Sequence, residues 1–119
     1  MRAVIDSDVM IDYLQGVDEA RAELAKYKVR EASMISWMEV MAGAETKDEE
    51  AACLGFLKTF RFHDITTEVA AEAVFLRKRY RIKLPDAIIW ATARTQGCLF
   101  VTCNSKDFPA GDPGVRIPY

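Results

Sequence analysis

Residues 1–14, MRAVIDSDVMIDYL, decide the fold of this chain. The apolar run at residues 3–5 does not alternate with polar residues, so it predicts a strand buried on both faces, as in a parallel sheet. Asp6 follows at once, and residues 8–14 carry apolar side chains at helical spacing. A carboxylate buried at this strand-to-helix junction is costly unless water, a helix N-terminus or a metal ion compensates it.

The rest of the chain alternates in the same way. Further strands are expected over residues 32–35, 62–65, 99–102 and 115–117, and further helices over residues 19–27, 36–43, 48–60, 67–80 and 84–96. Ser36 and Glu39 have the spacing of a capping box, which predicts a helix start at Ser36. Thr66 or Thr67 suits the cap of the fourth of these helices, and Pro85 suits a first helical turn.

This alternation predicts an α/β fold. We expect a three-layer α/β/α domain whose twisted, mostly parallel sheet has about five strands, with any site beyond the carboxyl ends of those strands. With 119 residues, 50% of them hydrophobic, the chain suits a single domain over residues 1–119. No apolar run is long enough to span a bilayer, and Asp6, Asp8 and Asp12 interrupt any signal peptide, so we expect a cytoplasmic protein.

Composition excludes several kinds of site. The single histidine, His63, cannot build a zinc site or a Ser-His-Asp triad by itself, and the three cysteines form no C-x-x-C pair. His63 is therefore interpreted as an ordinary strand residue. The net charge of −2 argues against nucleic-acid binding by bulk positive charge. A nucleic-acid enzyme remains compatible with it, because bound divalent ions add local positive charge.

Four acids are candidates for a site, although each has a plain structural explanation. Asp6 suits a helix cap, Glu39 can cap back onto Ser36, Asp86 lies in a helix first turn where the dipole favours it, and Asp107 suits a turn.

As a set, the four acids indicate more. Asp6, Glu39 and Asp107 each lie just past a predicted strand, and Asp86 can reach the same rim. Converging carboxylates repel one another unless a cation binds, and an all-oxygen ligand set suits Mg²⁺ or Mn²⁺. Such clusters with one or two ions carry out phosphodiester hydrolysis.

Four segments, in order, carry a family resemblance. They are VIDSDVMIDYL (residues 4–14), ISWMEVMAG (35–43), LPDAIIWATA (84–93) and VTCNSKDF (101–108). With this ordered set the chain resembles PIN-domain ribonucleases, and most of all the VapC toxins of bacterial toxin–antitoxin pairs. The resemblance implies catalytic, metal-binding acids at Asp6, Glu39, Asp86 and Asp107, supported by Ser7 and Asn104.

The resemblance also implies an activity and partners. These are Mg²⁺- or Mn²⁺-dependent endonucleolytic cleavage of RNA with one or two ions per site, a homodimer, and a toxin–antitoxin hetero-oligomer with a cognate VapB-like antitoxin. The antitoxin commonly extends a basic residue towards the acidic pocket. Asp8 departs from the family pattern, in which Asn or Ser is more usual; it is interpreted as a helix cap, with a contribution to a second metal site as the alternative.

A basic run at residues 77–83, RKRYRIK, precedes Asp86. Arg79 and Arg81 are candidates for contacts to RNA phosphates. An equally good explanation is a solvated helix C-terminus that complements the helix dipole.

Three other functions compete with this interpretation. An aspartyl-phosphate phosphatase would use Asp6 as nucleophile, but the LPDAIIWA segment lacks the glycine of that class's Gly-Asp motif, and the chain is short. A phospho-receiver signalling domain would bind Mg²⁺ through Asp6 and Asp8, with Asp64 as acceptor and Lys106 as the essential lysine. That leaves Glu39 and Asp86 without a role. A binding-only domain would hold RNA or a partner without turnover.

Overall fold

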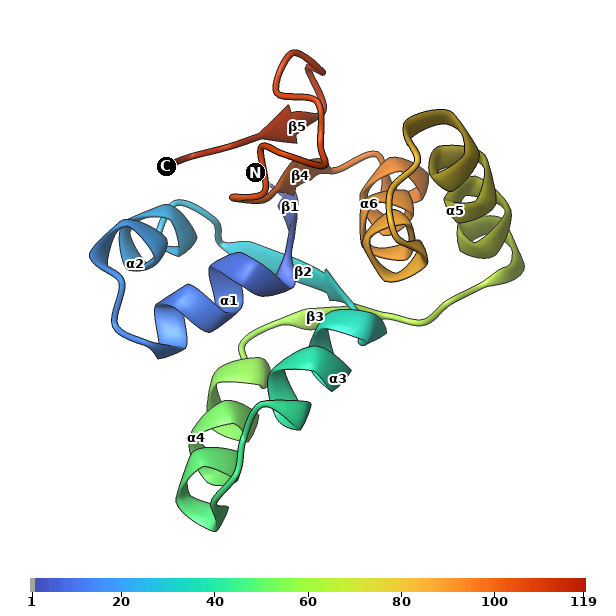
Figure 1. The fold of residues 1–119 in the computed structure, drawn as a ribbon. Coiled ribbons are helices and arrows are strands. Elements are labelled where there is room, and N and C mark those ends of the chain that lie inside the picture. The colour runs from blue at the N-terminus through green and yellow to red at the C-terminus, as the bar shows by residue number, and fades with distance from the viewer. Residues whose placement is uncertain (1) are drawn as a thin grey trace.

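The computed structural model describes residues 2–119 as a parallel sheet enclosed by helices (Figure 1). In chain order the elements are β1 (Arg2–Ile5), α1 (Ser7–Leu14), α2 (Asp18–Leu24), β2 (Val29–Ser33), α3 (Met34–Ala42), α4 (Lys47–Leu57), β3 (Arg61–His63), α5 (Thr67–Tyr80), α6 (Leu84–Gln96), β4 (Leu99–Val101) and β5 (Val115–Arg116). Within residues 2–119, no helix combines the length and apolar character needed to cross a membrane.

The sheet has the order β3-β2-β1-β4-β5, and all four pairings are parallel. Figure 1 shows α1 and α2 on one side of the sheet, and α5 and α6 on the other. One apolar core joins the sheet to α1–α4 and a second joins it to α5 and α6. The predicted three-layer α/β fold with about five strands is confirmed, and the sheet is parallel throughout the described strands.

The central strand β1 contributes to both cores. Ala3 and Ile5 are fully buried in the core with α1–α4, whereas Val4 is fully buried in the core with α5 and α6. Successive side chains of a strand point to opposite faces, so an uninterrupted apolar run is what a central strand between two helical layers requires. The polar residues that follow β1 therefore emerge at the carboxyl end of the sheet, between the two helical layers.

Most helix boundaries follow their local signals. Thr66 caps α5 by accepting a hydrogen bond from the Val69 N–H at 3.2 Å, as predicted for Thr66 or Thr67. Pro85 lies in the first turn of α6, where its missing N–H costs nothing. Gly97 ends α6 in the left-handed conformation, at φ 64°, which glycine adopts without strain.

The start of α3 was predicted wrongly. The helix begins at Met34 rather than at Ser36, because Ser33 is the cap and accepts a hydrogen bond from the Ile35 N–H at 3.1 Å. The preceding strand correspondingly spans Val29–Ser33 rather than residues 32–35. The charged residues Arg30 and Glu31 did not indicate a strand, since charged residues are unusual inside a parallel sheet.

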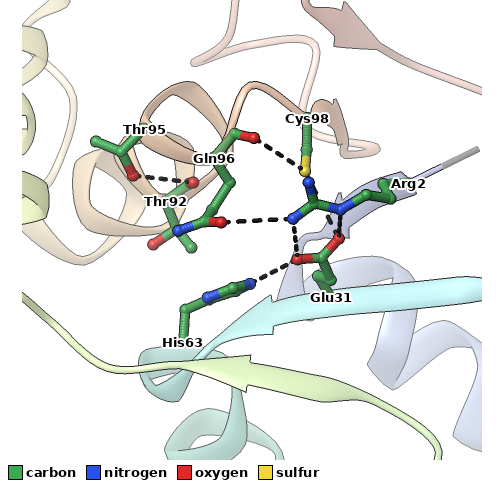
Figure 2. Close-up of polar contacts among 7 residues, drawn as sticks. All are labelled: Arg2, Glu31, His63, Thr92, Thr95, Gln96 and Cys98. Atoms are coloured by element: carbon green, nitrogen blue, oxygen red, sulfur yellow. Dashed lines mark hydrogen bonds and ion pairs between the residues drawn. The ribbon is translucent and has the colours of Figure 1, made fainter.

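A buried ion-pair network explains how Glu31 occupies β2 (Figure 2). The carboxylate is 0% exposed and accepts two hydrogen bonds from the Arg2 guanidinium, at 2.7 and 2.8 Å. The His63 Nε2 lies 2.6 Å from the same carboxylate. Arg2 first, and His63 after it, hold the pKa of Glu31 at about 2 against the opposing effect of burial. His63 is thus a residue of β3, as expected, with the added role of a hydrogen-bond partner of Glu31.

Candidate active site

Asp6 occupies the junction that the sequence singled out. It is the N-cap of α1 and is only 5% exposed. One carboxylate oxygen accepts the Ser7 N–H at 2.7 Å, and the other accepts the Thr102 hydroxyl at 2.7 Å. The Asp6 N–H donates to the Val101 carbonyl at 2.8 Å, which fixes the junction to the end of β4. Asp6 is therefore held rigidly, but by neutral donors only.

The charge on Asp6 is poorly compensated. Burial raises the pKa of its carboxyl to about 8, with Asp8 and then Asp86 adding to the rise, while the hydrogen bonds from Thr102 and Ser7 oppose it. Among residues 2–119, no lysine or arginine forms an ion pair with Asp6. A buried carboxylate in this state gains from binding a cation.

Glu39 reaches the same junction from α3. Its Oε1 accepts the Ser7 hydroxyl at 2.6 Å, and the Ser7 and Ser36 hydroxyls lie 2.9 Å apart. Because Ser7 has one proton, Ser36 donates to Ser7 while Ser7 donates to Glu39. Ser36 is fully buried, so this chain of hydroxyls holds the Glu39 carboxylate at Ser7, the residue that follows Asp6. The predicted capping box is accordingly wrong, since Ser36 faces Ser7 rather than the start of the helix.

Asp86 lies in the first turn of α6, as predicted. Burial raises the pKa of its carboxyl, and the nearby carboxylates of Asp107 and then Glu39 raise it further, whereas Lys83 lowers it. These influences identify its neighbours: two of the other candidate acids and one cation. Asp86 also raises the pKa of Asp6, so its carboxylate interacts electrostatically with all three of the other candidate acids.

Asp107 follows β4 and is exposed. The Asn104 side-chain amide donates to its carboxylate at 2.9 Å, and the Asp107 N–H donates to the Asn104 side-chain oxygen at 3.2 Å. This reciprocal pair makes the turn that the sequence predicted for Asp107. It also orients the carboxylate, so Asn104 supports Asp107 in the geometry seen here.

The acids suit a hard divalent cation by their chemistry. Among residues 2–119, no three His, Cys, Asp or Glu side chains lie close enough to form a ready metal cage. Asp86 instead interacts electrostatically with Asp6, Glu39 and Asp107. Their oxygens are the ligands that Mg²⁺ and Mn²⁺ prefer, and Mg²⁺ usually keeps several waters, so a few protein ligands suffice. The burial of Asp6 without a cationic partner fits the same ion.

Sequence reasoning missed two side chains that support the candidate site. Thr102 is fully buried and donates to Asp6, and Ser36 supports Glu39 through Ser7. Thr102 directly follows β4, so the rule that placed Asp6 at a strand end applies to it equally. Ser36 gave no such signal, because its distance from Ser7 depends on how α1 and α3 pack.

The two candidate RNA-binding arginines lie at the end of α5. Arg81 is the exposed C-cap and has a left-handed backbone, with φ 56°. The exposed Arg79 guanidinium lies 5.6 Å from the ring centroid of Tyr80. Lys83, at the N-cap of α6, is the basic residue whose charge acts on Asp86. The basic run thus approaches the acids at Lys83.

Comparisons with known proteins agree with this geometry. A family model described as the PIN domain matches residues 3–111. Ribonuclease VapC10 of Mycobacterium tuberculosis is 33% identical to this chain over 114 residues, which cover 89% of the chain and 85% of the relative.

Solved structures share the fold of this chain. A chain of a toxin–antitoxin complex from Klebsiella pneumoniae superposes with a TM-score of 0.92 at 42% identity, over 98% of both chains. DNA-bound VapBC from Salmonella typhimurium superposes with a TM-score of 0.78 at 22% identity, over 98% of this chain and 96% of that one, which shows a shared fold. The fold, the ordered motifs and these matches together establish that the chain belongs to the PIN-domain family, among the VapC ribonucleases.

Proposed function

We propose that this VapC-type ribonuclease cleaves RNA phosphodiester bonds with Mg²⁺ or Mn²⁺ held by Asp6, Glu39, Asp86 and Asp107, and acts as the toxin of a toxin–antitoxin pair. The observation that carries the proposal is Asp6, a buried carboxylate that acidic neighbours influence and that forms no ion pair with a lysine or arginine among residues 2–119. When bound, the ion supplies Lewis-acid chemistry: it acidifies water and offsets charge on the phosphate.

The chain's own contribution is to hold the acids in place. Thr102 and the Ser7 N–H fix both oxygens of Asp6, the Ser7 hydroxyl fixes Glu39, and Asn104 fixes Asp107. Ligands locked by such hydrogen bonds keep their geometry without reorganising during the reaction. No side-chain base is needed, which is consistent with a single histidine that is occupied at Glu31.

The proposed activity is tested by RNA cleavage with purified protein. We expect cleavage with Mg²⁺ or Mn²⁺, none with EDTA, and a loss of at least about 100-fold in Asp86→Asn. Asp64→Asn is the matched control, because Asp64 is an exposed aspartate after edge strand β3 and should leave cleavage unchanged. Cleavage in EDTA, or full activity of Asp86→Asn, would refute the proposal. Labelling of Asp64 by acetyl phosphate would instead favour a phospho-receiver.

We also propose that a cognate antitoxin occupies a groove between α1, α3 and α4. The groove has a volume of about 420 Å³, and its lining is largely apolar, including Leu14, Val40 and Ala52. Glu39 and Glu49 also line it, so it suits an apolar peptide segment that carries a basic residue. The match to a chain from a toxin–antitoxin complex supports such a partner.

The groove is tested by comparing two exposed alanines of α4. Ala52→Arg places a cation in the groove, whereas Ala51→Arg places the same side chain on the same helix outside the groove lining. Co-expression with the cognate antitoxin should yield a complex that survives Ala51→Arg and is weakened by Ala52→Arg. Equal affinity of both variants would move the antitoxin elsewhere.

A homodimer is the remaining proposed assembly. Phe75 and Val74 on α5 are large apolar residues that remain 53% and 47% exposed, and together they form a candidate contact between copies. Sedimentation of the purified protein should give the mass of a dimer, and Phe75→Glu should give that of a monomer. A monomeric wild-type protein would contradict this assembly.

A further inference from the structure

Asp8 is the second carboxylate in the first turn of α1, and its two oxygens have different partners. One accepts the N–H of Val9, at 2.7 Å. The other accepts the N–H of Cys103, at 3.1 Å, and lies 3.4 Å from the Thr102 hydroxyl. Asp8 therefore connects the start of α1 to the segment that follows β4.

That segment carries part of the acidic site. Thr102 donates its single proton to Asp6 and accepts the N–H of Asn104 at 3.1 Å. Two successive N–H groups, those of Cys103 and Asn104, are thus received by Asp8 and Thr102. Asn104 in turn holds Asp107 through the reciprocal side-chain pair. Hydrogen bonds and the intervening backbone thus connect Asp8 to Asp107.

We propose that Asp8 is a positioning residue, which holds residues 102–107 by accepting the Cys103 N–H and does not ligate the metal. The proposal rests on the proposed function, because it assigns Asp107 and Asp6 to the ion. Asp8 needs only an oxygen acceptor for this role, not a negative charge.

This role differs from capping alone. The hydrogen bond to Val9 stays within α1, whereas the bond to Cys103 spans 95 positions of the chain. Partners of this kind, which orient a ligand without touching the ion, typically contribute about 10- to 100-fold in activity or metal affinity.

The test separates the need for an acceptor from the need for a charge. Asp8→Asn keeps a side-chain oxygen, and Asp8→Ala removes both oxygens. If Asp8 positions the segment, Asp8→Asn keeps RNA cleavage and its half-maximal Mn²⁺ concentration within about threefold, whereas Asp8→Ala lowers kcat by about 10- to 100-fold. If Asp8 ligated the ion, Asp8→Asn would fail nearly as badly as Asp8→Ala, and the half-maximal Mn²⁺ concentration would rise in both.

A second readout does not depend on activity. Hydrogen exchange of the Cys103 amide, followed by NMR without metal, should quicken at least tenfold in Asp8→Ala and stay slow in Asp8→Asn. Asp12→Ala is the matched control, because Asp12 is on the same helix but accepts a bond from the Tyr119 hydroxyl, at 2.8 Å. Unchanged exchange in Asp8→Ala overturns the proposal. Should Asp8→Ala not fold, fast Cys103 exchange in the folded Asp8→Asn overturns it equally.

These experiments also distinguish failure of the proposed function from failure of the proposal for Asp8. An inactive wild-type protein would defeat the proposed function, while the exchange of Cys103 would still report whether Asp8 holds the segment. Normal cleavage with unchanged exchange in both Asp8 variants would leave the function standing and remove Asp8 from it.

Discussion

Two buried acids of the same sheet, Glu31 and Asp6, face opposite electrostatic conditions. Glu31 in β2 is paired with Arg2 and His63, and its pKa is lowered to about 2 (Figure 2). Asp6, directly after the neighbouring strand β1, has neutral donors and acidic neighbours, and its pKa is raised to about 8. The fold neutralises one carboxylate internally and leaves the other to be neutralised from outside. A structural acid and a candidate metal ligand are distinguished by their partners, since both are buried.

The largest expected effect comes from removing the charge of Asp6. Asp6→Asn should lower RNA cleavage by about 1,000-fold, or about 4 kcal/mol of transition-state stabilisation, because a metal-holding charge is lost. The same change should raise the melting temperature in EDTA, since a charge disfavoured by burial is removed. Cleavage assays and calorimetry measure the two effects. A lower melting temperature in EDTA would show that Asp6 is a structural acid like Glu31.

Removing a cation from Glu31 should have the reverse consequence. Arg2→Ala removes the guanidinium that donates two hydrogen bonds to the buried carboxylate and should lower the free energy of unfolding. Urea unfolding measures this loss. Arg61→Ala, an exposed arginine on β3 that forms no ion pair within residues 2–119, should change stability by less than about 0.5 kcal/mol. Equal effects of the two variants would mean that Glu31 is not held by Arg2.

Acid should weaken the Glu31 network next. The folded-state pKa of Glu31, about 2, lies below its unfolded value, so the unfolded chain binds the extra proton between about pH 4.5 and 2. The network's contribution is therefore complete above pH 4.5 and is lost as pH falls towards 2, by about 2 kcal/mol. Unfolding free energies measured across this range should fall less steeply in Glu31→Gln. Parallel slopes would contradict the lowered pKa.

The smallest expected effect is the stabilisation of the folded protein by bound metal, which is measured without RNA cleavage. Mn²⁺ at about ten times its dissociation constant should stabilise the wild-type protein by about 1.4 kcal/mol, because it binds only the folded state. Asp6→Asn should lose most of this gain, and Glu31→Gln should keep it. Thermal unfolding with and without Mn²⁺ measures the difference. A gain retained in Asp6→Asn would place the ion away from Asp6.

Much of the fold could be predicted from local sequence. The apolar run at residues 3–5, the Thr66 cap and Pro85 each act through their immediate neighbours, so they indicated β1, α5 and α6 correctly. The start of α3 could not be predicted in this way. Glu31 looks unsuited to a strand until Arg2 and His63, both far away in the sequence, are brought against it.

The same distinction between local sequence and tertiary contacts applies to the candidate site. The sequence by itself determined which carboxylates are available, and that Asp6 follows a strand and Asp86 lies in a first helical turn, because backbone propensities and hydrophobic periodicity are local. Only the tertiary structure decided their partners: neutral hydroxyls for Asp6 and Glu39, Asn104 for Asp107, and Cys103 for Asp8. Hydrogen bonding and desolvation act over a few ångströms in space, and packing alone sets which residues share that space.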